Sequence, residues 1–231
     1  MTSSKPSQYI KGWVEFYKLK FKVIPDVLIP RPETELLVDE VLKCIKYYVS
    51  GIKGKYILVL DIGTGAGNIT ISVAKNASNV RIIATDISNE ALEVAKQNAK
   101  LHKVLNKITF LQSDLLGTEN AQMRSIGTPD IIVTNLPYIP SARIPYLDSS
   151  VKDFEPHIAL DGGEDGFELY RKLFTQIRER SWKPKLILGE IDYTHGELAI
   201  NEAQKYFPQA KIEIKTDLAK KQRILAVEFP S

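Results

Sequence analysis

The side chains best suited to chemistry lie in the segment Asn135-Leu136-Pro137-Tyr138, directly after three β-branched apolar residues at 131–133. Such a run predicts a buried strand. The strand must stop at Pro137, because proline cannot donate a hydrogen bond to a neighbouring strand. Ligands of open α/β sheets bind beyond the carboxyl ends of the strands. We therefore expect Asn135 to lie at the edge of a ligand site.

The groups in this segment match one kind of ligand. The Asn135 side chain offers a neutral carbonyl acceptor and an NH2 donor. The backbone carbonyl of Leu136, aimed by the rigid ring of Pro137, is a second acceptor, and Tyr138 adds a flat face and a hydroxyl. Two acceptors beside a flat face suit a planar –NH2 group, as on a carboxamide or an exocyclic base amine. A strand end with a proline turn explains these four residues equally well, because short motifs often match by chance.

A glycine-rich loop, Asp61-Ile62-Gly63-Thr64-Gly65-Ala66-Gly67, follows the strand expected at residues 56–61. Glycines let the backbone approach a ligand closely and open a helix N-terminus toward it. The spacing is not that of a dinucleotide-binding loop, because Asn68 stands where the third glycine belongs, and no Walker Lys-Ser/Thr pair follows. Asp61 would repel a pyrophosphate, so the loop predicts a cationic ligand.

Carboxylates follow the next two expected strands. Asp86 ends the strand at residues 80–86, where a carboxylate can accept both hydroxyls of a ribose. A helix N-cap is the plainer interpretation of Asp86, but Ser88 or Asn89 fills that role. Asp114 and Leu115 follow the strand at residues 108–112 and could bracket an adenine, with Asp114 near its amino group.

The elements that must position these residues alternate along the chain. A helix over residues 33–48 precedes the first buried strand, and the chain ends with an antiparallel pair at 211–215 and 223–229. Between them we expect the three strands above and two more strands, at residues 130–135 and 185–190. Four more helices are expected at residues 68–75, 89–102, 167–180 and 195–206. Residues 1–8 are expected to be disordered. Aromatic and polar residues alternate over 9–23 and predict a short β-hairpin.

Composition narrows the class of protein. The chain has 231 residues, is 44% hydrophobic and carries a net charge of +3, which suits one domain with a small appendage. Its charges are dispersed, so an extended nucleic-acid footprint is not indicated. The single cysteine, Cys44, fits a reducing compartment and a core position. No signal peptide or membrane span is expected, and the scattered histidines form neither a metal-ligand spacing nor a hydrolase triad.

Together these features resemble the class I fold of S-adenosylmethionine-dependent methyltransferases. Within that class the chain resembles the HemK/PrmC family, the peptide chain release factor glutamine N5-methyltransferases. Four segments carry the resemblance, at residues 28–35 (Leu-Ile-Pro-Arg-Pro-Glu-Thr-Glu), 61–67, 135–140 and 155–163. The first and the last are specific to this family, whereas the whole class shares the glycine loop.

The resemblance implies a Rossmann-like seven-stranded α/β sheet with an antiparallel last strand, preceded by the hairpin. Residues 1–26 would be a tail and hairpin, the remnant of a linker to a helical domain, and residues 27–231 the catalytic domain. S-adenosylmethionine would be the cofactor, leaving S-adenosylhomocysteine, and no metal is implied. The cofactor would contact Asp61, Gly63, Thr64, Gly65, Ala66, Gly67, Asp86, Asp114, Leu115 and Asn135. The catalytic group would be Asn135, Leu136, Pro137 and Tyr138, and a lip over the substrate would contain Arg31, Glu33 and Glu155.

The implied activity is methyl transfer to the side-chain nitrogen of a glutamine in the Gly-Gly-Gln loop of a cytoplasmic translation release factor. Leu136 keeps an alternative open, since the family has Asn-Pro-Pro-Tyr and Asn-Leu-Pro-Tyr is more typical of ribosomal RNA adenine dimethyltransferases. Methylation of adenine N6 in RNA or DNA is therefore the second hypothesis. A cofactor-binding subunit without turnover and an NAD-dependent dehydrogenase also remain open, and tests of methyl transfer and of NAD binding separate them.

Overall fold

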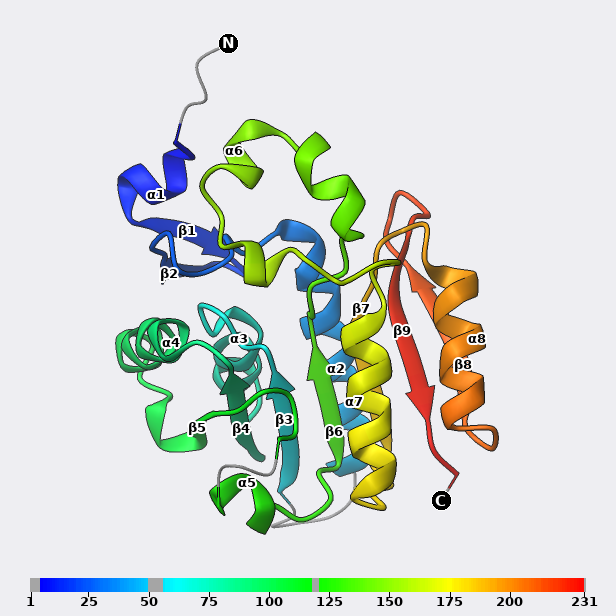
Figure 1. Cartoon of the computed structure of the whole chain (residues 1–231). Coiled ribbons are helices and arrows are strands. Elements are labelled where there is room, and N and C mark those ends of the chain that lie inside the picture. Colours follow the sequence, from blue (N-terminus) through cyan, green and yellow to red (C-terminus); the bar gives the residue numbers. More distant parts are fainter. Residues whose placement is uncertain (1–4, 50–55, 118–120, 231) are drawn as a thin grey trace.

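The computed structural model describes residues 5–49, 56–117 and 121–230. A seven-stranded sheet in the order β5-β4-β3-β6-β7-β9-β8 lies between two layers of helices (Figure 1). The first five strands of that order are parallel, and β9 is antiparallel to both of its neighbours. The strands are β3 (Ile57–Ile62), β4 (Val80–Asp86), β5 (Ile108–Gln112), β6 (Ile131–Thr134), β7 (Leu186–Glu190), β8 (Lys211–Thr216) and β9 (Gln222–Glu228).

The helices cover both faces of the sheet, and shorter pieces lie above the carboxyl ends of the parallel strands (Figure 1). The longer helices are α2 (Glu35–Val49), α3 (Asn68–Asn76), α4 (Asn89–Leu101), α7 (Glu168–Glu179) and α8 (Gly196–Tyr206). The short ones are α1 (Ser7–Lys11), η1 (Pro32–Thr34), η2 (Leu105–Lys107), α5 (Ala121–Ser125), η3 (Ser141–Tyr146), α6 (Ser149–Lys152) and η4 (His157–Ala159).

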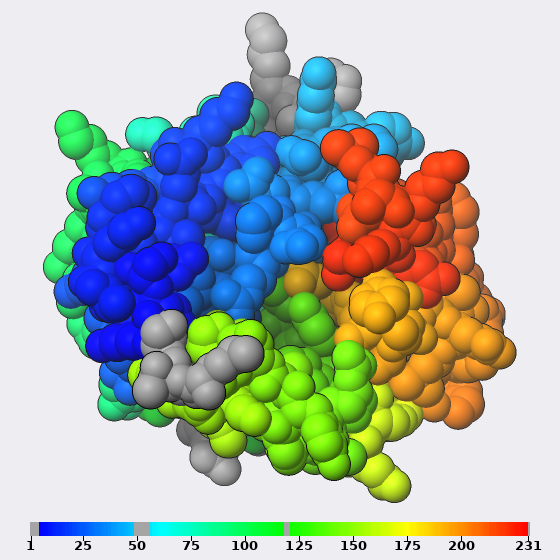
Figure 2. Space-filling model, turned by 90° about the horizontal axis from the view of Figure 1, so that it is seen from above, coloured from blue at the N-terminus to red at the C-terminus, as the bar shows by residue number. Residues whose placement is uncertain are grey.

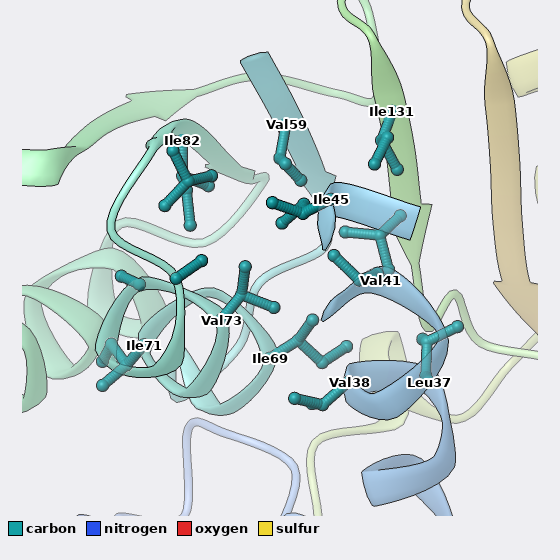
Figure 3. Close-up of a cluster of buried hydrophobic side chains, with 14 of the residues drawn as sticks. Leu37, Val38, Val41, Ile45, Val59, Ile69, Ile71, Val73, Ile82 and Ile131 are labelled. Atoms are coloured by element: carbon teal, nitrogen blue, oxygen red, sulfur yellow. The ribbon is translucent and has the colours of Figure 1, made fainter. Parts of the chain in front are cut away.

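Side chains that alternate along the strands build two cores, one on each face of the sheet. Val59 packs with residues of α2 and α3, such as Val41 and Val73 (Figure 3). The next residue, Leu60, points to the opposite face and packs in the cluster that holds Phe174 of α7. A parallel sheet buried on both faces is a rigid platform, and its strand ends hold whatever follows them in fixed positions.

Strand order places the functional segments side by side. The order reverses between β3 and β6, and such a switch point leaves a crevice at the carboxyl ends of the strands. Ile62 of β3 pairs with Thr134 of β6, which in turn pairs with Gly189 of β7. Gly63, Asn135 and Glu190 therefore leave the sheet at the same level.

The N-terminal segment packs onto this edge. The hairpin of β1 (Trp13–Phe16) and β2 (Leu19–Lys22) is fastened to α4 by Asn98, whose Oδ1 accepts from the Lys22 N–H at 2.8 Å. Asn98 Nδ2 also donates to the Ala66 carbonyl of the glycine loop at 2.9 Å. The Tyr9 hydroxyl donates to the Val27 carbonyl at 2.6 Å. These contacts hold residues 27–31 over the crevice.

Most sequence-based elements are confirmed, and β4 and β5 have the predicted bounds. The hairpin prediction is wrong for residues 9–11, because α1 begins at Ser7 after Pro6 and ends at Lys11, where Gly12 caps it with a left-handed φ of 78°. The disorder expected for residues 1–8 is therefore wrong at residues 7 and 8, and residues 1–4 lie outside the described ranges. Residues 141–160, where no element was predicted, hold three short helices, and the short helix α5 was not predicted either.

Candidate active site

A cavity of about 1060 Å³, including its open mouth, lies at the carboxyl ends of β3, β4, β5 and β6. Viewed from above that edge, the molecule is hollowed where green residues from the middle of the chain lie between the blue N-terminal part, the yellow-green segment after β6 and the red turn after β8 (Figure 2). The predicted site residues that line the cavity are Arg31, Gly63, Thr64, Gly65, Ala66, Asp86, Asp114, Leu115, Asn135, Leu136 and Pro137.

Asp61 lies beneath the glycine loop and is not part of the cavity wall. Strand alternation turns its side chain toward α3, where Oδ2 accepts from the hydroxyls of Thr64 at 2.8 Å and Thr70 at 2.6 Å. Its Oδ1 is buried and has no hydrogen-bond partner among the described residues. Burial raises the pKa of Asp61 to about 6, the two hydroxyls oppose that shift, and the charge of Asp86 adds to it. A buried carboxylate with a spare oxygen fits a cation bound above the loop.

Asp86 fixes the path of the same loop and still faces the cavity. Its Oδ2 accepts from the Gly65 N–H at 2.8 Å and its Oδ1 from the Ser88 N–H at 3.0 Å. Burial raises the pKa of Asp86, and these N–H groups work in the opposite direction. Each carboxylate oxygen keeps a second lone pair, so Asp86 can also accept hydroxyls of a ligand.

Gly67 has a packing role and does not line the cavity. Its φ is +80°, and a Cβ built there would lie 2.9 Å from Ile71 Cδ1 and 3.1 Å from Ala95 Cβ. Only glycine lets α3 start this close to α4.

Asp114, the third predicted carboxylate of the site, is more exposed than Asp61 and Asp86. Asp114 Oδ2 pairs with Lys172 Nζ at 2.5 Å, and both side chains are about half exposed. Leu115 is buried and has a φ of +51°, an unusual value for leucine that turns it into the cavity wall.

Asn135 is held through its NH2 group. Its Nδ2 donates to the buried Thr34 Oγ1 at 3.2 Å, across 101 residues of sequence. No described residue donates to its Oδ1, so the carbonyl oxygen is available to a ligand. Thr34 is a site residue that the sequence analysis missed, although it lies inside the family-specific segment at 28–35.

Tyr138 and Glu190 form a second hydrogen-bonded pair near Asn135. The Tyr138 hydroxyl donates to Glu190 Oε1 at 3.3 Å, so Tyr138 lies beside the cavity and not in its lining. Glu190 is 3% exposed, and its Oε2 has no close partner among the described residues. Burial raises the pKa of Glu190, while hydrogen bonds from Thr34 and Tyr138 and the charge of Arg223 favour the ionised form. Glu190 was also missed, and its place at the end of β7 is the signal that could have found it.

The three residues of the predicted lip differ in how they face the cavity. Arg31 lines the cavity and forms an ion pair with Glu155, whose side chain is 1% exposed. Glu155 Oε2 also accepts from the Ile29 N–H at 3.3 Å. The buried Glu155 carboxylate therefore joins the two family-specific segments and does not line the cavity, and its place in a lip over the substrate stays a prediction. Glu33 is exposed on η1 and does not line the cavity.

The described residues contain no group of three or more His, Cys, Asp and Glu side chains arranged to hold a metal ion. In the same ranges, no helix has the length and apolar character needed to span a membrane.

Comparison with known proteins identifies the family and agrees with the fold. A family model described as a methyltransferase domain matches residues 53–178. The chain is 37% identical, over 97% of its length, to the release factor glutamine methyltransferase of Bacillus cereus and covers 76% of that protein. It is 36% identical to the protein of the same name from Lactococcus lactis, covering 97% of this chain and 78% of the relative.

Solved structures agree on the architecture. The N-terminal domain of human METTL16 in complex with SAH has a TM-score of 0.64 at 15% identity, covering 93% of this chain and 77% of that one. A human methyltransferase 10 domain containing protein has a TM-score of 0.60 at 14% identity, covering 93% and 90%. At such identities the likeness concerns the fold alone.

The sheet order, the cavity at the switch point and the matching domain model define a class I methyltransferase. The similarity to the bacterial enzymes covers nearly the whole chain. The chain belongs to the release factor glutamine methyltransferase family.

Proposed function

We propose that this protein transfers a methyl group from S-adenosylmethionine to the side-chain nitrogen N5 of a glutamine, in the Gly-Gly-Gln loop of a translation release factor. Family membership supports the choice of substrate. The observation that carries the chemistry is the Asn135 carboxamide, whose NH2 is engaged by Thr34 while its oxygen is left for a ligand.

The residues around the cavity fit this cofactor. Asp86 faces the cavity with spare lone pairs for ribose hydroxyls, and Asp114 and Leu115 form the wall proposed for an adenine. The buried Asp61 carboxylate, with one oxygen unpartnered beneath the glycine loop, suits a ligand that carries positive charge. When bound, the cofactor supplies an electrophilic methyl group on a positively charged sulfur.

The acceptor nitrogen needs help from the protein, because the lone pair of an amide is delocalised into its carbonyl. Asn135 Oδ1 and the Leu136 carbonyl accept its two N–H bonds and aim the nitrogen into the cavity. Positive charge grows on this nitrogen as it reacts, so both acceptors bind the transition state more tightly than the ground state. The ring of Tyr138 packs on the amide plane. Positioning supplies much of the rate, and water takes the proton that the product releases readily.

Transfer of radiolabelled methyl from S-adenosylmethionine tests the proposal. A release factor, its variant with the Gly-Gly-Gln glutamine changed to alanine, and unmodified ribosomal RNA are offered in parallel. Label on the release factor that disappears in the variant supports glutamine methylation. Label on RNA alone favours the adenine alternative that Leu136 keeps open, and label on neither substrate contradicts both.

Asn135→Ala removes one of the two acceptors. We expect it to lower kcat by about 10²-fold or more, the scale measured for one preorganised polar contact in a transition state. Affinity for the cofactor should change much less. Asn76→Ala, at the far end of α3, is the matched control and should keep full activity. Equal activity of the Asn135→Ala and wild-type enzymes refutes the assignment.

A further inference from the structure

The loop at residues 161–166 packs directly on the backbone that follows β6. A Cβ built at Gly162 would lie 2.7 Å from the Pro137 carbonyl oxygen and 2.8 Å from Tyr138 Cα. A Cβ built at Gly166 would overlap the Tyr138 carbonyl oxygen. Side chains do not approach other atoms so closely, so the two glycines let one backbone lie against the other.

Backbone hydrogen bonds join the same two segments. The Ile139 N–H donates to the Leu160 carbonyl at 3.1 Å, and the Ile139 carbonyl accepts from the Gly162 N–H at 2.9 Å. These two bonds form a short parallel bridge between Ile139 and Asp161. The strand β6 ends at Thr134 and holds the acceptor residues from one side, and the bridge holds them from the other.

The side chain of Asp161 ties the two segments together a second time. Its Oδ1 accepts from the Ser141 hydroxyl at 2.6 Å and from the Gly163 N–H at 2.9 Å. The Ser141 N–H in turn donates to the Gly163 carbonyl at 2.8 Å. One carboxylate oxygen therefore fixes both the turn of the loop and the chain just beyond the acceptor residues.

The loop is itself fastened to a rigid helix. Glu168, the first residue of α7, donates its N–H to the Gly162 carbonyl at 3.1 Å, and its Oε1 accepts from the Glu164 N–H at 2.9 Å. The helix packs in the core through Tyr170 and Phe174, which have no exposed surface. We therefore expect bulk added at Gly162 to displace the segment after β6 and to leave the loop in place.

These contacts reach the chemistry because Pro137 and Tyr138 follow the second proposed acceptor. The Leu136 carbonyl lies in the peptide plane that it shares with the nitrogen of Pro137. Misplacement of a reacting group by about 1 Å can lower a rate by about 10²-fold. Gly162 does not line the cofactor cavity. The loop can therefore affect the aim of the acceptor without touching the cofactor.

We propose that Gly162 and Asp161 are positioning residues for methyl transfer, which fix the backbone of Pro137 and Tyr138 and with it the direction of the Leu136 carbonyl. This inference rests on the proposed function, which assigns that carbonyl to the methyl-accepting nitrogen. Residues 161–163 of the family-specific segment act from behind the acceptors, and neither positioning residue needs to touch the substrate.

Gly162→Ala tests the contact. Its φ lies outside the left-handed region, so the added methyl group acts through contact and not through backbone strain. We expect kcat to fall about ten-fold or more, with little change in the Kd of S-adenosylmethionine or in the thermal unfolding midpoint. Gly127→Ala, where a Cβ would meet nothing within 4 Å, is the matched control and should keep wild-type kcat. Wild-type kcat in Gly162→Ala overturns the proposal, and so does a fall in kcat that is matched by an equal loss of cofactor affinity.

Asp161→Ala keeps the inference testable if Gly162→Ala does not fold, because it removes two hydrogen bonds without adding bulk. We expect kcat to fall by about three- to ten-fold, the range for one hydrogen bond, with unchanged cofactor Kd. Asp161→Asn keeps an acceptor oxygen and should recover most of that loss. An Asp161→Asn enzyme as slow as Asp161→Ala, or an Asp161→Ala enzyme with wild-type kcat, overturns the role of these hydrogen bonds.

A measurement that does not depend on activity separates this inference from the proposed function. The sequence contains two Pro-Tyr pairs, Pro137-Tyr138 and Pro145-Tyr146. Labelling proline carbonyls with ¹³C and tyrosine amides with ¹⁵N therefore gives two correlation peaks in an NMR spectrum, and Tyr146→Phe identifies the second by its loss. The Pro137-Tyr138 peak should shift in Gly162→Ala, and both peaks should stay in place in Gly127→Ala.

The two failures then look different. An unshifted Pro137-Tyr138 peak in Gly162→Ala overturns the positioning role, whatever the activity of the variant. A shifted peak, together with a wild-type enzyme that methylates no offered substrate, supports the contact and contradicts the proposed function instead.

Discussion

Replacing Asp61 with asparagine tests whether this buried charge is kept for a ligand at the expense of the fold. The side chain is fully buried, and burial raises its pKa from 3.8 to about 6. The folded protein therefore holds this proton more tightly than the unfolded chain does. The stability that follows from the raised pKa is fully present below pH 3.8 and is lost as the pH rises through about 6.

The rise in the pKa of Asp61 sets the size of its effect on the free energy of unfolding. One pKa unit corresponds to about 1.36 kcal/mol, so a rise of roughly two units costs the ligand-free protein about 3 kcal/mol above pH 6. Linkage between pH 5 and pH 7 gives a loss of about 1.3 kcal/mol in the free energy of unfolding from this group alone. Asp61→Asn removes that part of the pH dependence, while its amide oxygen can still accept from Thr64 and Thr70. The amide NH2 would replace the unpartnered Oδ1, which offsets part of the gain at neutral pH by about 1–3 kcal/mol.

Urea unfolding of the ligand-free protein at pH 5 and pH 7 measures the difference. The wild type should lose about 1.3 kcal/mol more than Asp61→Asn over that interval, and the exposed Asp153→Asn should behave like the wild type. Equal pH dependence in the wild type and Asp61→Asn refutes the reasoning. A second readout concerns the ligand: S-adenosylmethionine carries the sulfonium charge and S-adenosylhomocysteine does not, so Asp61→Asn should weaken binding of the first more than of the second.

Two further substitutions test the lip and the loop. Arg31→Ala leaves the Glu155 carboxylate buried without its cation. Urea unfolding should show that the free energy of unfolding falls by about 3 kcal/mol, the low end for such pairs because Arg31 is one-third exposed. A fall below about 0.5 kcal/mol, which is in the range of exposed pairs, would contradict this expectation. Gly67→Ala places a Cβ 2.9 Å from Ile71 Cδ1 at a φ of +80°, and should lower stability by about 1–3 kcal/mol. An unchanged thermal midpoint would mean that the start of α3 is not close-packed.

The sheet could be predicted because each parallel strand is a short apolar run that ends in a polar or breaking residue. The runs before Asp61, Asp86 and Asn135 are of this kind, and parallel strands converge at one edge. The helix α1 could not be predicted, since its five residues are too few for a helical period and its end depends on the left-handed Gly12. Aromatic alternation around Tyr9 then favoured a strand.

The site was predictable where it follows the strand ends and not where it depends on distant contacts. The cavity lining of Asp86 and Asn135 follows from sheet topology alone. No local pattern shows that Glu155 pairs with Arg31 across 124 residues, or that Thr34 meets Asn135 across 101. Asp61 was assigned to the cavity because it precedes the glycines, but the alternation of β3 turns its side chain beneath them.

Leu136 is the residue where this chain departs from the Asn-Pro-Pro-Tyr motif, and its surroundings bear on the choice between glutamine and adenine. Its side chain is 3% exposed and belongs to the core cluster on the α7 side of the sheet. Leu136 Cδ2 would lie 3.6 Å from a Cβ at Gly63, so the leucine fills the space under the glycine loop. The group proposed to accept a hydrogen bond from the substrate is its backbone carbonyl, which any residue supplies.

The side chain of Leu136 therefore should not select the substrate. Leu136→Pro, which restores the family's residue, is expected to leave the ratio of release-factor to RNA methylation unchanged. Repacking of the core around the smaller ring should lower both rates by the same factor. Parallel labelling of the two substrates by wild type and variant measures the ratio. A ratio that moves toward the release factor on restoring the proline would show that the loop backbone at position 136 takes part in selection. A constant ratio would show that position 136 does not select the substrate, since the neutral acceptors would receive either kind of –NH2 group.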